Sequence, residues 1–192
     1  MGMGRWEPDA RERLVHAALD LFVEHGYDNT GVVEIAERAG LTKSTFFRHF
    51  PDKREVLFVG QEALNGLLAD GIAGAPGAAT PLEAVAAALE AVAVVFPSAR
   101  REFASRRRAV IAANTERQER EALKRAGFAA AMTEALERRG VSEATANVAA
   151  ELGVLAFRSA FARWADPACD QGFGELARQE LEALQAASAS LS

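Results

Sequence analysis

The amino-acid sequence predicts an all-α protein. Nearly every patterned segment has apolar residues three and four positions apart, which is the spacing of one helix face. No segment alternates apolar and polar residues as a half-buried strand does, and no internal repeat is visible. The 192 residues are 49% hydrophobic and 26% charged, which is typical of a globular protein. A chain of this length favours two small domains over one large domain.

Residues that start and end helices divide the chain into nine expected helices. Pro8 or Asp9 suits the first turn of a helix, and Gly26 ends that helix. Thr42 is a good N-cap, and Pro51 ends the short helix that follows it. The expected helices span about residues 9–25, 32–39, 42–50, 53–72, 81–96, 98–114, 116–139, 142–164 and 174–187.

The composition excludes several classes of protein. A single cysteine, Cys169, excludes an internal disulfide and a zinc-binding thiolate cluster, as is usual in a reducing compartment. The longest nearly apolar run, Ala84 to Phe96, contains Glu90 and is shorter than the roughly 20 residues that span a bilayer. The first residues lack the apolar core of a secretory signal. We therefore expect a cytoplasmic protein.

The charge is unevenly distributed along the chain. The net charge is -5, yet residues 38–54 contain five basic residues against Asp52 alone, which gives this segment a net charge of +4. Residues 1–37 are acidic. A basic segment in an acidic chain indicates a localised site for an anionic partner such as nucleic acid.

The basic segment fits a helix-turn-helix, with two short helices at 32–39 and 42–50. Ala36 must be small because the two helices touch there, and Gly40 lies where the turn favours a left-handed backbone. The residues expected to point inward, against the first helix, are Ile35, Ala39, Leu41, Phe46 and Phe50. The residues expected to point outward are Lys43, Ser44, Thr45, Arg48 and His49.

The segment from about Asp9 to Leu57 resembles the N-terminal domain of the TetR (tetracycline-repressor) family. The similar stretches are FVEHGYDNT and VVEIAERAGLTKSTFFRHFPDKREVL, in one continuous register. The resemblance implies a transcriptional regulator, usually a repressor, whose homodimer sets two recognition helices in successive major grooves of an operator. It implies a DNA-binding domain at residues 1–54, with the helix-turn-helix at about 32–51, and a ligand-binding and dimerisation domain at residues 55–192.

Roles in DNA binding follow from the helix geometry and the resemblance. Thr30 and Thr42 stand at helix starts, where free backbone N–H groups bind phosphate. His49 and Lys53 match phosphate-contacting positions of the family. The candidates for base contacts are Lys43, Ser44 and Thr45, with Val33 near a thymine methyl and Arg48 at either a base or a phosphate.

Two points stay open at this surface. Phe47 occupies a position where the family usually has a tyrosine whose hydroxyl bonds a phosphate, so we expect weaker DNA binding, by about 1.5–3 kcal/mol at most. The alternative is that Phe46 and Phe47 both belong to the core. Arg5 and Trp6 form either an arm that reaches the minor groove or a frayed terminus.

Helix 142–164 is apolar on two faces, and such a helix is buried on both. One face meets its own core, and the other suits a partner. Helix 174–187 is the second expected contributor, and the resemblance implies an intersubunit four-helix bundle. The alternative is a central helix in a monomeric bundle. The expected dimer-interface residues are Val148, Leu152, Leu155, Phe173, Leu181 and Leu184.

Helix 98–114 places polar side chains on an apolar face, and buried polar groups need partners. We hypothesise a small-molecule site in which Arg107 meets a carboxylate or a phosphate. The alternative is a structural hydrogen bond or a stripe that reaches solvent. The candidate ligand-binding residues are Phe96, Phe103, Arg107, Ile111, Asn114, Phe128, Met132 and Phe161.

The sequence gives little support to an enzyme. Its three histidines, His16, His25 and His49, all lie in the N-terminal region, and no phosphate-binding glycine loop, nucleophile elbow or metal-ligand spacing is present. We expect no cofactor and no membrane partner. The expected partners are double-stranded operator DNA, a second copy of the chain and an unidentified small-molecule inducer. An interaction protein that does not bind DNA is the remaining alternative.

Overall fold

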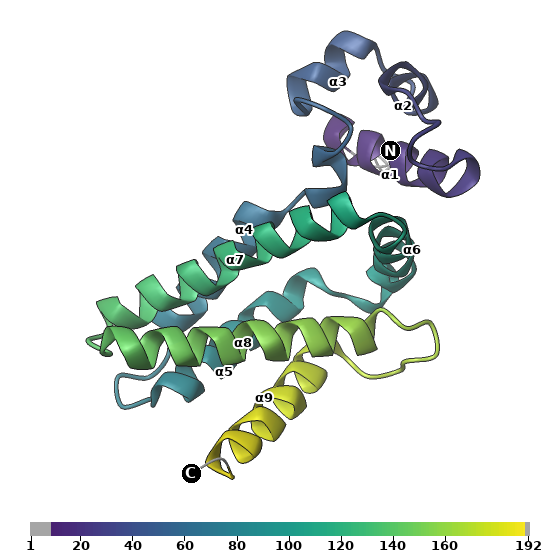
Figure 1. The fold of residues 1–192 in the computed structure, drawn as a ribbon. Coiled ribbons are helices and arrows are strands. Elements are labelled where there is room, and N and C mark those ends of the chain that lie inside the picture. The colour runs from purple at the N-terminus through teal and green to yellow at the C-terminus, as the bar shows by residue number, and fades with distance from the viewer. Residues whose placement is uncertain (1–8, 191–192) are drawn as a thin grey trace, which may run out of the picture. The chain divides into compact units, whose positions relative to one another are not determined.

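The computed structural model describes residues 9–190, which form nine α-helices, three short 3-10 helices and no strand (Figure 1). The predicted all-α fold is confirmed. Pro8, Arg5 and Trp6 lie outside the described residues. The α-helices are α1 (Ala10–His25), α2 (Val32–Arg38), α3 (Lys43–His49), α4 (Gln61–Ala73), α5 (Pro81–Val92), α6 (Arg101–Ala112), α7 (Thr115–Arg138), α8 (Glu143–Trp164) and α9 (Phe173–Ala189).

The helix starts follow from local capping. The Asp9 carboxylate accepts the N–H of Arg11 ahead of α1, and the Thr42 hydroxyl accepts the N–H of Thr45 at 3.2 Å ahead of α3. Ser142 caps α8 in the same way. Each cap satisfies a backbone donor that has no partner inside its own helix, and so fixes the residue at which the helix begins.

The helix expected at residues 53–72 is wrong as one continuous element. The structure has a 3-10 helix, η1 (Glu55–Phe58), and then α4 from Gln61. Gly60 separates them with a φ of 89°, a left-handed conformation that glycine adopts without steric cost. The 3-10 helices η2 (Ala93–Val95) and η3 (Ser98–Arg100) likewise take up the ends expected for the next two helices.

The chain divides into two compact units. The N-terminal unit contains α1 to η1, up to Val59, together with Arg106–Arg117. The C-terminal unit contains Gly60–Ser105 and the chain from Gln118 onward. The sequence places the boundary after residue 54 and assigns everything beyond it to the second domain, whereas the structure assigns the end of α6 and the start of α7 to the N-terminal unit.

The N-terminal unit is built around a small apolar core. α1, α2 and α3 pack against one another, and α1 also contacts η1. Leu14, Ile35 and Phe46 are fully buried there, and Phe50 is 2% exposed. Ile35, Phe46 and Phe50 are positions that the helix-turn-helix pattern points inward, so the pattern correctly predicts the side of each short helix that is buried.

The C-terminal unit is a helical bundle in which α5 packs against α4, α8 and α9. Glycines allow two of the close helix contacts. A Cβ on Gly71 of α4 would lie 2.5 Å from Ala88 Cα of α5, and a Cβ on Gly153 of α8 would lie 2.7 Å from Val85 Cγ1. Small residues at these crossings let the backbones approach to a distance that any larger side chain would prevent.

No single helix among residues 9–190 has the length and apolar composition needed to cross a membrane. One pair, Pro81–Val95 with Ser98–Ala112, meets that length and composition only together and is bent by 69°.

Candidate functional site

The turn between α2 and α3 has the predicted backbone. Gly40 has a φ of 66°, and the N–H of Leu41 donates to the carbonyl of Ala36 at 2.8 Å. Ala36 is 1% exposed where the helices meet. Arg13 of α1 donates to the carbonyl of Ala39, and its guanidinium fills the space that a Cβ on Gly40 would need. The turn therefore holds α3 at a fixed angle to α2 and α1.

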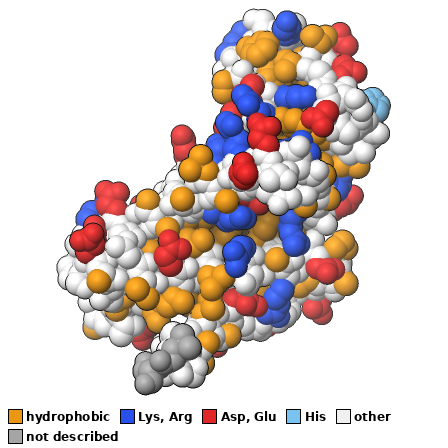
Figure 2. All heavy atoms as spheres, in the orientation of Figure 1, with side chains coloured by type: hydrophobic (Ala, Val, Ile, Leu, Met, Phe, Trp, Pro, Cys, Tyr) orange, Lys and Arg blue, Asp and Glu red, His pale blue; other side chains and the backbone are white. Residues whose placement is uncertain are grey.

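The outer face of α3 is exposed and carries the residues predicted for base contacts. Lys43, Ser44 and Arg48 are exposed, and Thr45 is half-buried. Phe47 is 49% exposed, and Val33 on α2 is 46% exposed. In the space-filling view, hydrophobic and basic side chains lie next to one another on the surface of the N-terminal unit (Figure 2).

The two neighbouring phenylalanines have different environments. Phe46 is fully buried, whereas Phe47 reaches the surface. Their ring centres are 5.6 Å apart, in an edge-to-face arrangement. Lys43 Nζ lies 5.9 Å from the centre of the Phe47 ring, one helical turn away. The alternative in which both phenylalanines are core residues is therefore wrong, and Phe47 is part of the exposed face.

Most of the basic residues in the segment 38–54 form ion pairs or hydrogen bonds with other groups of the N-terminal unit. Arg38 pairs with Glu24 at 2.7 Å, and Arg54 pairs with Asp52 at 2.8 Å. The Arg38 hydrogen bond lowers the pKa of Glu24, and the Arg54 hydrogen bond lowers the pKa of Asp52. Arg48 has no hydrogen bond or ion pair with any residue in the described range. Lys43 and Arg48 thus remain as the charges available to a ligand on α3.

Thr30 does not reach the exposed face. Its side chain is 1% exposed, and its hydroxyl donates to the carbonyls of Gly26 at 2.8 Å and Leu21 at 3.3 Å. These bonds tie the loop after α1 to the end of α1. The expected phosphate contact of the Thr30 side chain is therefore corrected to a structural role, whereas Thr42 remains exposed at the start of α3.

Lys53 also points toward its own chain. Its ammonium donates to the carbonyls of Tyr27 and Thr30, both at 2.9 Å, and more weakly to that of Asp28 at 3.5 Å. A lysine ammonium has three donors, and these carbonyls occupy them. The structure thus gives Lys53 an internal role in holding the loop between α1 and α2, in place of the phosphate contact that the resemblance implies. His49 is half-buried at the end of α3.

The predicted ligand-binding residues are divided between the two units. Arg107, Ile111 and Asn114 lie in the N-terminal unit, whereas the five other candidates lie in the C-terminal unit. Arg107 donates to the carbonyl of Leu57 and lies over the Phe58 ring, and the Asn114 side chain accepts the N–H of Arg117 at 3.2 Å. The alternative of structural hydrogen bonds is correct for these two polar residues. Ile111 is 2% exposed in the same unit.

Four of the remaining candidates belong to the core of the C-terminal unit. Phe96, Phe128, Met132 and Phe161 pack there. Phe103 is half-buried on α6. Three further aromatic rings surround Phe96, namely Phe157, Trp164 and Phe173, whose ring centres lie 5.8, 5.3 and 4.5 Å from that of Phe96. Helical spacing from Phe161 was the available signal for Phe157 and Trp164 on α8, whereas Phe173 on α9 was expected at the dimer interface.

Trp164 carries a buried donor inside this aromatic cluster. It is 1% exposed, and its indole N–H has no acceptor among the described residues. The Arg101 guanidinium lies over its ring, with the carbon 5.8 Å from the ring centre. A buried N–H without an acceptor is unusual in a folded protein and favours a polar guest next to the ring.

The predicted dimer residues separate into an exposed group and a buried group. Val148 is 63% exposed, and Leu152 and Leu155 are half-buried on the outer face of α8. Phe173 and Leu181 are 2% and 4% exposed and pack in the core of their own unit, with Leu184 partly buried against the same core. Phe173 and Leu181 are therefore corrected to core residues of their own unit, whereas Leu184 is only partly covered.

Comparisons with known proteins agree with this geometry. A profile of bacterial regulatory proteins of the tetR family matches residues 14–58. The transcriptional regulator TcmR of Streptomyces glaucescens is 37% identical over 78 residues, which cover 41% of this chain and 34% of TcmR. The matched segment is thus about a third of that relative's own length.

Similar solved structures extend the likeness to the fold of most of the chain. The transcriptional regulator FadR from Bacillus subtilis, in complex with stearoyl-CoA, has a TM-score of 0.62 at 17% identity and covers 90% of this chain and 96% of its own. The TetR-family regulator PfmR from Thermus thermophilus has a TM-score of 0.50 at 25% identity and covers 88% of this chain and 95% of its own. The match shows that residues 14–58 form a helix-turn-helix segment of the tetR family of bacterial regulatory proteins, and most of the chain shares the fold of these solved regulators.

Proposed function

We propose that the protein is a transcriptional repressor that binds a near-palindromic operator as a homodimer and is released by a small molecule bound in the C-terminal unit. The observation that carries this proposal is the outer face of α3, where Lys43, Ser44, Phe47 and Arg48 are exposed above a buried Phe46. A recognition helix must be held rigidly by the core against which it packs, because base contacts require fixed side-chain positions.

The chemistry of this face suits the major groove of DNA. Lysine and arginine bind the acceptors of guanine, and serine bonds to several base edges. The exposed rims of Phe47 and Val33 offer apolar contact to a thymine methyl group. Thr42, at the exposed start of α3, suits a phosphate oxygen. Thr30 and Lys53 are left out of this interface because their side chains bond within the chain.

Dimer formation is supported by the outer face of α8. Val148, Leu152 and Leu155 form an apolar row in which Val148 is exposed and the two leucines are half-buried. A homodimer carries two α3 helices, and the operator half-sites of helix-turn-helix dimers lie about one turn of DNA apart, roughly 34–36 Å. Each helix would then read the same sequence on opposite strands.

Ligand binding is assigned to the aromatic cluster around Phe96 and Trp164. The rings supply an apolar wall, and the indole N–H of Trp164 would donate to an acceptor on the ligand. Phe128, Met132 and Phe161 remain in this proposed site. A coupling of about 1–3 kcal/mol between ligand and operator would change DNA affinity roughly 5- to 150-fold.

The DNA-binding proposal is tested with fluorescence anisotropy on a labelled fragment flanking the protein's own gene, at two salt concentrations. We expect binding whose affinity falls steeply with salt, because phosphate contacts release counterions. Lys43→Ala and Arg48→Ala should each weaken binding by at least about tenfold. Arg100→Ala, which removes an exposed charge in the C-terminal unit, is the matched control. Equal binding by all four proteins would reject the proposal.

The ligand proposal is tested with stearoyl-CoA, the molecule bound to the B. subtilis FadR of similar fold. Its titration into a Trp6→Phe variant should change the fluorescence of Trp164, the remaining tryptophan. Linkage requires that operator DNA weaken ligand binding by the same factor by which the ligand weakens DNA binding. Equal ligand affinity with and without operator would exclude release by this ligand, and a reporter gene would measure whether the regulator represses.

A further inference from the structure

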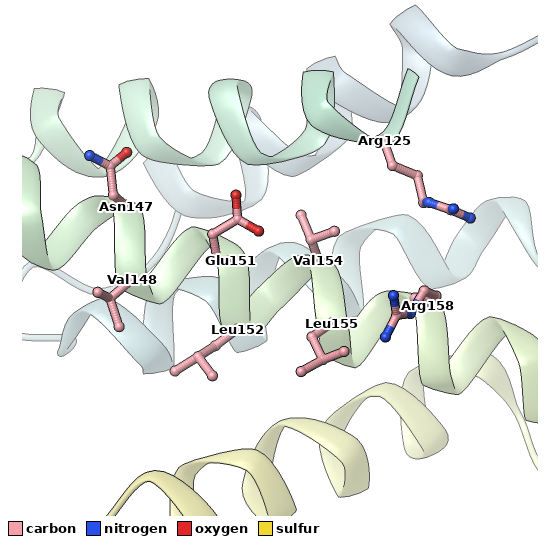
Figure 3. A pocket seen from close by; sticks show the side chains of 8 residues that line it. All are labelled: Arg125, Asn147, Val148, Glu151, Leu152, Val154, Leu155 and Arg158. Carbon is pink, nitrogen blue, oxygen red and sulfur yellow. The ribbon is translucent and has the colours of Figure 1, made fainter. Parts of the chain in front are cut away.

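The outer face of α8 forms a groove with an uneven distribution of charge. The groove has a volume of about 480 Å³ and lies within the C-terminal unit. Its lining comprises Arg125 of α7 and seven α8 residues: Asn147, Val148, Glu151, Leu152, Val154, Leu155 and Arg158 (Figure 3). The two arginines lie toward the C-terminal end of α8, and Glu151 lies nearer its N-terminal end. Figure 2 shows hydrophobic side chains gathered at the level of α8, with basic side chains toward one end.

Two of these charges have no partner within the chain. Neither Glu151 nor Arg158 makes a hydrogen bond or an ion pair with any residue from 9 to 190. They do not pair with each other, and seven residues of α-helix separate them by about 10.5 Å along the axis. Arg125, in contrast, pairs with Glu121 at 3.0 Å. Glu151 and Arg158 are therefore the open charges of the groove.

Their spacing has a geometric consequence. Seven residues make almost two full turns, so Glu151 and Arg158 lie on the same side of α8. Leu155 lies between them along α8 (Figure 3). When two copies of a helix pack antiparallel about a two-fold axis, side chains on one side of the first copy face the same side of the second. An axis midway between residues 151 and 158 then brings each glutamate against the arginine of the other copy.

We propose that the groove binds the same groove of a second copy, in the register in which Glu151 of each copy pairs with Arg158 of the other across Leu155. This inference deepens the proposed homodimer, on which it rests, by naming the contact that sets its register. The pair occurs twice by symmetry. Any other alignment of the two α8 helices leaves these charges unpaired against apolar residues. An unpaired charge at a desolvated contact costs free energy. The charges thus select one arrangement of two apolar rows that could otherwise slide.

The experiment measures the dimer dissociation constant by analytical ultracentrifugation of the full chain. Glu151→Arg places two arginines in contact, and Arg158→Glu places two glutamates in contact, so each single variant should raise the dissociation constant at least about tenfold. The double variant Glu151→Arg/Arg158→Glu restores both pairs with reversed polarity and should return to within about threefold of the original value. Glu137→Arg, at an exposed α7 position outside the groove, should have no effect.

A mixing experiment gives the sharpest result. In a heterodimer of the two single variants, the arginine introduced at position 151 faces the glutamate introduced at position 158. The unchanged Arg158 of the first variant faces the unchanged Glu151 of the second, so two proteins that associate weakly alone should associate with each other. Circular dichroism at increasing temperature shows that each variant is folded. Single variants that dimerise like the original protein, or a mixture that does not associate, would overturn the proposed register.

The failures of the register and of the dimer can be told apart. If Leu152→Asp dissociates the dimer while the charge variants do not, the homodimer stands and the register is wrong. If the unchanged protein is a monomer at about 50 µM, both the register and the proposed homodimer are wrong.

Discussion

The guanidinium carbon of Arg117 lies 4.4 Å from the centre of the Tyr27 ring. Lys53 Nζ lies 4.5 Å from the same ring centre, so two cations contact one aromatic side chain. Arg117 is 9% exposed, and its Nε donates to the carbonyl of Val110 at 3.0 Å. The ring thereby joins the first turn of α7 to the loop ahead of α2. The chain of α7 continues from Gln118 into the C-terminal unit.

Substitutions of Tyr27 separate the ring from its hydroxyl. The hydroxyl is buried without a partner among the described residues, and burial raises the pKa of Tyr27. Tyr27→Phe keeps the ring and should leave the free energy of unfolding unchanged or raise it by up to about 1 kcal/mol, because an unpaired buried hydroxyl is costly. Tyr27→Leu loses both cation contacts and should lower the free energy of unfolding by about 1–2 kcal/mol. Urea denaturation measures the free energy of unfolding of both variants. Equal changes in the two variants would contradict a stabilising contact between the ring and the two cations.

Lys53→Met tests whether Lys53 acts inside the chain or on DNA. The variant keeps the length of the side chain and removes the donor to three loop carbonyls, so we expect the free energy of unfolding to fall by about 1–3 kcal/mol. The slope of log affinity for DNA against log salt should stay the same. A stable variant whose salt slope falls by about 1 would instead indicate a phosphate contact.

Phe47→Tyr should strengthen DNA binding. The ring is 49% exposed, so the added hydroxyl reaches solvent and can donate to a phosphate without disturbing the core. We expect about three- to tenfold tighter binding with an unchanged salt slope, because a neutral donor releases no counterion. Phe46→Tyr is the contrasting variant, because its hydroxyl would enter a fully buried site. A tyrosine at position 47 that leaves affinity unchanged would place this residue away from the DNA backbone.

Two glycines of α4 should respond oppositely to alanine. A Cβ on Gly71 would lie 2.5 Å from the Ala88 backbone, whereas a Cβ on Gly66 meets nothing within 4 Å. Gly71→Ala should lower the free energy of unfolding by about 1–3 kcal/mol through overpacking. Gly66→Ala should raise the free energy of unfolding by about 0.5–1 kcal/mol, because alanine loses less backbone entropy than glycine when a helix forms. Thermal denaturation of both variants checks the close contact of α4 with α5.

Asp52 should give the protein part of its stability against acid. Hydrogen bonds from the Arg54 side chain and from backbone N–H groups hold the pKa of Asp52 below its usual value. A lowered pKa means that the stabilisation is fully present above the ordinary value of about 3.9 and is lost as the pH falls through the lowered one.

Asp52→Asn should therefore cost less than about 1 kcal/mol near pH 7, since the pair is partly exposed. Melting temperatures of the variant and the original protein should converge as the pH falls below about 4. Asp70→Asn, at an exposed carboxylate of α4, is the control. A constant difference across this range would show that the carboxylate charge is not the cause.

Most of the helices and several of their starts could be predicted from the sequence because they depend on near neighbours. Asp9, Thr42 and Ser142 cap helices through contacts two or three residues away, and Gly40 fixes its turn by its own φ. The division between Phe46 and Phe47 follows from helical periodicity. The two apolar faces of α8 also follow from helical periodicity. Such interactions need only the local chain, and the same holds for the resemblance at the helix-turn-helix.

The direction of the polar side chains was decided by the tertiary structure. Lys53 bonds to a carbonyl 26 residues away, and Arg107 bonds to one 50 residues away, so no local pattern shows that these cations are already occupied. Phe173 and Leu181 are buried by α5 and α8, and a helical stripe cannot tell its own core from a partner. A side chain's periodicity gives the face on which it lies, but only packing between distant segments determines what that face meets.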